Sequence, residues 1–141
     1  MGLFSGKRPP GLGVTNGVFK PCSWKPNCVN STADAVTDAA HYIAPFKFSG
    51  AAAGAWANAV NAVKSGQRVT VVTETSTYLY AEYASRTLGY IDDVELFLDA
   101  VAGLIQIRSA SRLGVRDFGV NRARAEALRA ALAADATHPA N

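Results

Sequence analysis

Apolar and polar residues alternate with a period of two through much of the second half of the chain. Segments of this kind, rich in β-branched and aromatic residues, are typical of strands with one buried face. They occupy residues 68–74, 77–84, 90–98 and 104–110. The connections between them are too short for the crossover that parallel neighbours need. The pattern therefore predicts a four-stranded antiparallel meander.

A helical period precedes these strands. Trp56, Val60 and Val63 follow one another at helical spacing and form an apolar stripe. Ser49 can cap this helix at its start, and a Ser-Gly pair can end it directly after Lys64. We therefore expect a helix between these two positions.

A second amphipathic helix is expected near the end of the chain, over residues 122–134, with Asn121 as its N-cap. Its apolar face consists of Ala127, Leu128, Ala131 and Leu132. Two helices and a meander predict an α+β fold in which both helices pack on one face of the sheet.

The length of 141 residues corresponds to one domain with a core of its own. Residues 1–20 are rich in glycine and proline without a period, which predicts a flexible arm. The single α+β domain is expected over residues 21–134, followed by a tail at 135–141. The most apolar stretch, residues 51–63, is too short for a transmembrane segment, and residues 1–13 lack the apolar region of a signal peptide.

The net charge of +3 conceals an uneven distribution, with arginines concentrated between residues 108 and 129. A basic surface can bind nucleic acid or phosphate. No aromatic residues alternate with these arginines as base-stacking platforms would require, so a nucleic-acid partner is disfavoured. Arginines that pair with carboxylates of the middle region are the simpler interpretation.

Cys22 and Cys28 are the only cysteines, and five residues separate them. They can close a small disulfide loop, remain free thiols or form half of a metal site. A zinc site would need two more ligands, and the only histidines are His41 and His138. Metal is the least favoured of the three interpretations, and we expect no cofactor.

Strand alternation places Asp93 and Glu95 on one face of the third predicted strand and Asp92 on the other. Glu82 and Arg108 have the parity to join Glu95 on that face of the sheet. Because adjacent Asp92 and Asp93 point to opposite faces, the three acidic residues of this strand can form a metal-hydrolase site together only if a β-bulge re-aims one of them.

This predicted cluster has two interpretations. Arg108 and Arg112 could grip a carboxylate or phosphate by bidentate hydrogen bonds, or they could fix the arginine-rich loop onto the sheet as a structural network. In the second interpretation Asp117 and Asn121 tie down the backbone of that loop. No serine or cysteine nucleophile with a histidine base is recognisable, and no Gly-rich phosphate loop.

Three motifs resemble those of a known family: PNCV at residues 26–29, YIDDVE at 90–95 and RSASRxGxxDxGVNR at 108–122. The chain is similar, over about residues 21–132, to an uncharacterised family of small bacterial and plant-plastid proteins. The resemblance implies no reaction, substrate or cofactor. Members of such a family are often exported or membrane-anchored, which would favour the disulfide.

We therefore expect a non-enzymatic accessory domain that binds a protein partner or a small anionic ligand through the arginine-rich loop and the sheet face. The alternative is an enzyme that uses Glu82 or Glu95 with Arg108. The chain as given would be cytoplasmic, but exported or periplasmic if the disulfide forms.

Overall fold

The computed structural model describes residues 4–137 and shows an α+β fold built on one mostly antiparallel sheet. The main sheet has six strands in the order β3-β8-β7-β6-β5, and β4 also pairs with β8. These strands are β3 (Cys28–Asn30), β4 (Phe46–Lys47), β5 (Val69–Glu74), β6 (Tyr78–Ala84), β7 (Ile91–Asp99) and β8 (Leu104–Ser111). A separate small hairpin joins β1 (Val14–Thr15) and β2 (Val18–Phe19).

The predicted meander is present as β5 to β8, but the prediction of a four-stranded sheet is wrong. The two additional strands, β3 and β4, pair antiparallel with β8. They contain only three and two residues, so neither can display a period of two. Tertiary pairing with β8, rather than local pattern, makes them strands.

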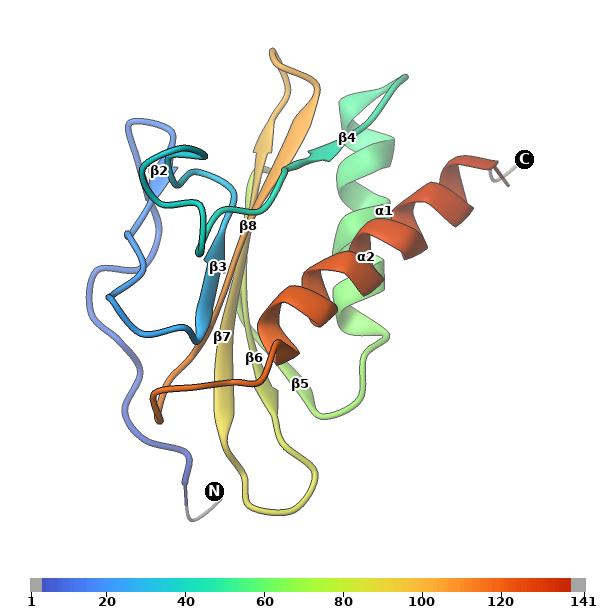
Figure 1. The fold of residues 1–141 in the computed structure, drawn as a ribbon. Helices are drawn as coiled ribbons and strands as arrows, with labels where there is room; N and C mark the ends of the chain where they lie inside the picture. Colours follow the sequence, from blue (N-terminus) through green and yellow to red (C-terminus); the bar gives the residue numbers. More distant parts are fainter. Residues whose placement is uncertain (1–3, 138–141) are drawn as a thin grey trace.

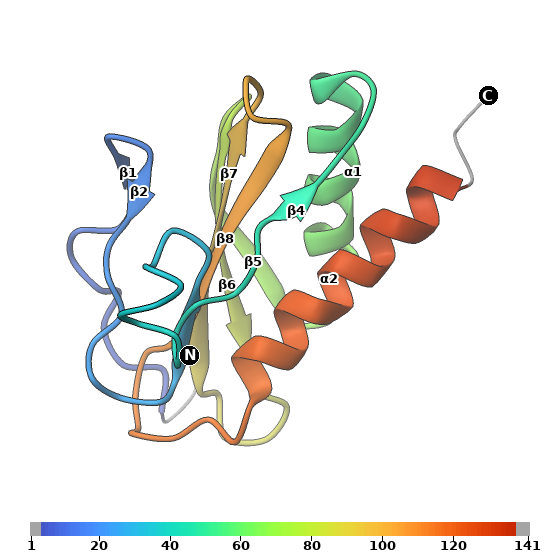
Figure 2. The same cartoon turned by 45° about the horizontal axis from the view of Figure 1, so that its top comes forward.

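Two helices, α1 (Ala52–Lys64) and α2 (Val120–Thr137), lie on the same face of the sheet and diverge from each other (Figures 1 and 2). The core lies between them and the sheet. Its largest fully buried side chains include Val63 of α1, Leu79 of β6, Leu96 of β7 and Ile107 of β8. No helix of the described residues is long and apolar enough to cross a membrane.

The apolar stripe predicted for α1 is confirmed, since Trp56, Val60 and Val63 are all buried. The predicted capping by Ser49 is wrong. The N-cap position is Ala51, which offers no side-chain hydrogen bond. Trp56 instead ties the helix to the sheet, because its indole N–H donates to the carbonyl of Thr75 at 3.1 Å.

Asn121 is not the N-cap of α2, because the helix already includes Val120. The capping function falls to Asp117, whose carboxylate accepts the backbone N–H of Gly119 at 2.9 Å and of Asn121 at 3.0 Å. The expected tail at 135–141 begins inside this helix, and residues 138–141, including His138, lie outside the described residues.

The expected flexible arm, residues 1–20, runs over its described part along the sheet face opposite the helices (Figures 1 and 2). Ser5 and Phe19 are buried there. Strand alternation placed charged residues together on one face of the sheet but did not indicate what covers that face. In this structure the arm covers it, and the site is built between the two.

Candidate functional site

The strand register assembles a charged cluster on the face beneath the arm. Glu95 of β7 lies opposite Tyr80 of β6 and Arg108 of β8. Two pairs further along, and so on the same face, Glu82 lies opposite Asp93. Glu82, Glu95 and Arg108 therefore share one face, as their parity predicted. Asp92 points to the helix side, where its carboxylate pairs with Arg124 of α2 at 2.8 Å.

Glu95 is fully buried at the centre of this cluster. Its Oε2 accepts the hydroxyl of Tyr78 at 2.5 Å and the backbone N–H of Gly13, from the arm, at 2.7 Å. Its Oε1 has no hydrogen-bond partner, although Arg108 Nη1 lies 3.9 Å away. Burial raises the pKa of Glu95, and the hydrogen bonds from Tyr78 and Gly13 only partly oppose this.

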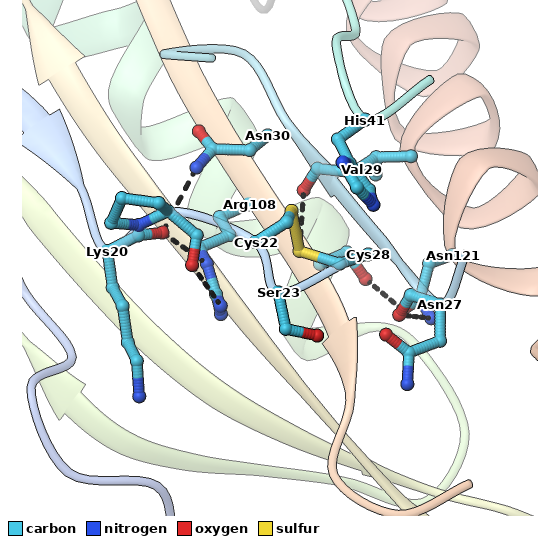
Figure 3. Close-up of a disulfide and its surroundings, with 12 residues drawn as sticks. Lys20, Cys22, Ser23, Asn27, Cys28, Val29, Asn30, His41, Arg108 and Asn121 are labelled. Atoms are coloured by element: carbon cyan, nitrogen blue, oxygen red, sulfur yellow. Dashed lines mark hydrogen bonds between the residues drawn. A yellow bond between two sulfur atoms is a disulfide. The ribbon is translucent and has the colours of Figure 1, made fainter. Parts of the chain in front are cut away.

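Arg108 faces two backbone carbonyls beside the cysteine loop (Figure 3). Its Nε donates to Lys20 O at 2.8 Å and its Nη2 to Pro21 O at 3.5 Å. Because the side chain is buried, the pKa of Arg108 is lowered despite the nearby Glu95. Arg108 therefore binds the backbone that leads into the disulfide rather than an external anion.

The disulfide joins Cys22 and Cys28, so the two cysteines are neither free thiols nor metal ligands (Figure 3). The closed loop places Trp24 in solvent, with 76% of its surface exposed. His41 is buried nearby, with its ring nitrogens 2.6 Å from Asp38 Oδ1 and 2.9 Å from Lys25 O. It is a satisfied structural histidine. Within residues 4–137, no three metal-ligating side chains gather at one site.

Arg112 is the second arginine of the predicted site, and its guanidinium is also used internally. It forms a bidentate pair with Asp93, with Nε 3.1 Å from Oδ2 and Nη2 2.6 Å from Oδ1. Nη2 also donates to Glu82 at 2.6 Å, and Nη1 donates to the carbonyl of Ser5 in the arm. The hydrogen bond to Asp93 is the main reason that the pKa of Arg112 is raised.

Glu82 completes the link to the arm, because its Oε2 also accepts the Nε–H of Arg8 at 3.0 Å. Burial acts to raise the pKa of Glu82, but the hydrogen bonds from Arg8 and Arg112 outweigh it and lower the pKa. Glu82 thus pairs with Arg112 and Arg8 rather than with Arg108. The cluster is divided into two networks that meet at the arm.

Asp117 and Asn121 fix the arginine-rich loop, as the structural interpretation expected. The Asn121 side chain is fully buried. Its amide donates to Asn27 O, Ser111 Oγ and Asp117 Oδ2, and its carbonyl oxygen accepts the hydroxyl of Ser109 at 2.6 Å. One side chain therefore connects α2, β8 and the disulfide loop.

The loop between β8 and α2 also carries a feature that the sequence did not reveal. Phe118 is 93% exposed and has a backbone φ of 54°, in the left-handed region. Only the neighbouring Asp117, Gly119 and Gly114 could have indicated a tight loop, and they say nothing of where the aromatic ring points. Leu113 and Val115 of the same loop are exposed as well.

The larger of two cavities in the described part of the chain lies away from the charged cluster and from the Phe118 loop. It is a groove of about 1000 Å³ between α1, α2 and β4, lined by mostly apolar side chains such as Phe46, Phe48 and Leu132. A smaller pocket of about 460 Å³ lies between α1 and the β5–β6 turn. Neither is lined by any of the predicted site residues.

A family model described as "Protein of unknown function (DUF1499)" matches residues 19–132. This range contains the three motifs and the complete charged cluster of the sheet. It agrees with the resemblance to an uncharacterised family that the motifs indicated. Comparisons with curated proteins and with solved structures found no match.

Proposed function

The chain belongs to the DUF1499 family of proteins of unknown function, and we propose that it is a non-enzymatic binding domain that docks a protein partner through the loop between β8 and α2. Phe118 is the central contact of the proposed surface. A left-handed φ is unfavourable for a bulky residue and persists only where the surrounding structure imposes it. The exposed ring makes no core contact that would explain this conformation, which supports a role in binding.

The loop around Phe118 is held in a way that suits a binding surface. Asp117 and Asn121 fix the loop at one end. At the other end, the side-chain amide of Asn27, which belongs to the disulfide loop, donates a hydrogen bond of 2.8 Å to Gly114 O. A side chain on a backbone held at both ends loses little further freedom when a partner binds. Preorganisation therefore favours the loop as a binding element.

The surroundings of Phe118 have the composition of an interface. Leu113, Val115 and Arg116 are exposed on the same loop. The disulfide loop, which Asn27 bonds to Gly114, exposes the indole of Trp24. Aromatic residues and arginine are enriched where binding energy concentrates. These side chains favour a partner with an apolar patch and acidic groups at its margin.

A small anionic ligand at Arg108 and Arg112, the other expectation, has less support. Both guanidiniums already donate to carboxylates or carbonyls of the chain. The enzyme alternative meets a similar obstacle, since Glu95 is fully buried beneath Gly13 and cannot reach a substrate in this conformation. The charged cluster is covered by the arm in this structure, which leaves the exposed loop as the better candidate for docking a protein partner.

The disulfide supports a location in an oxidising compartment, such as the periplasm or the outside of the cell, where such bonds persist. The cytoplasm keeps most thiols reduced. Alkylation of the protein in freshly lysed cells of its natural host would distinguish the two, because a disulfide blocks both cysteines from the reagent.

The proposed function is tested by affinity capture with three forms of the immobilised protein. Wild type, Phe118→Ala and Val101→Ala are exposed to the same native extract, and retained proteins are quantified by mass spectrometry. Val101 is a matched control because it is fully exposed in the β7–β8 turn. A partner retained by wild type and by the control should fall about tenfold or more with Phe118→Ala. Equal retention by all three forms would refute the proposal.

A further inference from the structure

The sheet face beneath the arm has features of a second binding site. It buries Asp93, Glu95, Arg108 and most of Arg112. Charges buried in this way contribute little net stability, because the cost of removing them from water offsets their mutual attraction. Apolar side chains would cover a sheet face as well. The charges therefore suggest that this face recognises something.

The contacts between the face and the arm are those of a bound peptide. Sheet side chains bind the main chain of the arm: Arg112 binds Ser5 O, Glu95 binds Gly13 N–H and Arg108 binds Lys20 O. Among the described residues of the arm, the side-chain ion pair with the sheet is that of Arg8 with Glu82, and the Arg8 guanidinium also lies 5.9 Å from the ring centre of Tyr80. Main-chain contacts give affinity for any extended segment, and a pocket for one side chain gives specificity.

The arm is a weakly anchored occupant. Of the described arm residues only Ser5 and Phe19 are buried, and Arg8 and its neighbours are largely exposed. A segment with so few buried contacts opens at lower free energy than the sheet does. The arm can therefore leave the face without unfolding the domain.

The arm also leaves part of the face unsatisfied. Glu95 Oε1 is buried without a hydrogen bond, while its other oxygen accepts the arm's Gly13 N–H. Buried acceptors are nearly always paired in native proteins, so an orphan oxygen marks a place for another donor. A segment with one further N–H near Gly13 would fit the face better than the arm does.

The family match separates most of the arm from the sheet face. It includes every sheet residue of this face and begins at residue 19, leaving the arm contacts from Ser5 to Gly13 outside the matched range.

We propose that the charged sheet face is a peptide-binding site, occupied in cis by residues 4–18, which accepts an extended arginine-containing segment of another chain when the arm is displaced. Glu82 binds the arginine of that segment, Glu95 binds a backbone N–H and Arg112 binds a backbone carbonyl, while Arg108 stays bound to Lys20 O and Pro21 O beside the disulfide. This site lies on the sheet face and is distinct from the Phe118 loop.

A fluorescent synthetic peptide of residues 2–18 is the probe, and anisotropy titration against the full chain is the measurement. Gly13→Pro removes the N–H donated to Glu95, and proline cannot adopt the φ of 108° found there, so the arm in cis is released. Because the competing arm lowers the apparent affinity of wild type, the Gly13→Pro chain should bind the probe at least about tenfold more tightly.

Three variants complete the test. Arg8→Ala in the chain should also increase probe binding, by a smaller factor, whereas Lys7→Ala should not, because Lys7 makes no ion pair among the described residues. A probe carrying Arg8→Ala should bind several-fold more weakly to the Gly13→Pro chain. If neither Gly13→Pro nor Arg8→Ala, each shown to be folded by circular dichroism, binds the probe more tightly than wild type, the proposal is overturned.

Discussion

Asn121 shows how much of this fold depends on one side chain. Its amide group joins the first turn of α2 to the end of β8 and to the disulfide loop. The contact with Asn27 joins residues 94 positions apart in the sequence, and the contacts with Ser109 and Ser111 join α2 to the strand that precedes it. The residue therefore acts as a fixed junction rather than as the helix cap that its position suggested.

Replacement of Asn121 by alanine should lower the free energy of unfolding by about 2–3 kcal/mol, because the buried hydroxyl of Ser109 loses its acceptor and a cavity is left. Urea denaturation followed by circular dichroism measures the change. Asn58→Ala, on the exposed side of α1, is the control and should stay within about 0.5 kcal/mol of wild type. A loss no larger than that of the control would contradict the proposed role of Asn121.

Glu95 should make stability depend on pH. Because burial raises its folded pKa above the ordinary value of 4.5, the unfolded chain releases this proton first as pH rises. Wild type then loses stability until pH reaches the raised folded pKa. Glu95→Gln keeps an acceptor for Gly13 N–H but does not titrate, so its stability relative to wild type should increase upward from about pH 4.5.

Urea denaturation of both proteins between about pH 4 and pH 8 measures this difference. Other carboxylates, such as Glu82 with its lowered pKa, titrate in both proteins and cancel in the comparison. A difference that is constant or falls with rising pH would show that the buried carboxylate is not destabilised in the fold.

Phe118 should cost stability where it stands. The left-handed conformation is unfavourable by about 1–2 kcal/mol for a residue with a side chain. Replacement by glycine removes this cost, but it raises the entropy of the unfolded chain, which lowers stability by about 0.4–1 kcal/mol. Since the ring is exposed, Phe118→Gly loses no packing and should stabilise the protein by about 0.5–1 kcal/mol in urea denaturation. Destabilisation of this variant would indicate that the ring packs in solution.

At the scale of elements, the period of apolar residues was enough to predict the longer strands and helices. The meander and the buried stripe of α1 follow from alternation and helical spacing alone. The short strands β3 and β4 could not be recognised, because each exists only through its hydrogen bonds to β8. Parity likewise placed Glu95 with Arg108, but it could not show that Arg112 would take Asp93 and Glu82 as partners, since that depends on the path of the loop after β8.

The disulfide loop is the element whose contribution can be removed separately. Closing so short a loop stabilises the fold by about 2 kcal/mol in the chain-entropy model. Reduction with dithiothreitol should lower the unfolding free energy by that amount, as measured in urea with thiol titration to confirm reduction. The double variant Cys22→Ser/Cys28→Ser is the control and should not respond to the reductant. If reduced wild type were as stable as the oxidised protein, the disulfide would contribute nothing to the stability of the fold.

At the scale of the whole molecule, the sheet separates two environments. The helix side is an apolar core of the usual kind, and the opposite side is a charged layer held beneath the arm. Parity predicted a charged cluster on a sheet face, and the helical periods predicted two helices packed on one face, but neither predicted that these are opposite faces. The sequence could not show that the arm would cover the charged one, because its glycines and prolines carry no period and bind mainly through backbone atoms.

The exposed loop end is the part of the molecule where we place its function, and Phe118→Gly tests this most directly. The variant is expected to be at least as stable as wild type, so any loss of binding cannot be assigned to unfolding. Retention of the partner captured by wild type should fall about tenfold or more on immobilised Phe118→Gly. Undiminished retention by this variant would contradict the assignment of Phe118 as the binding residue.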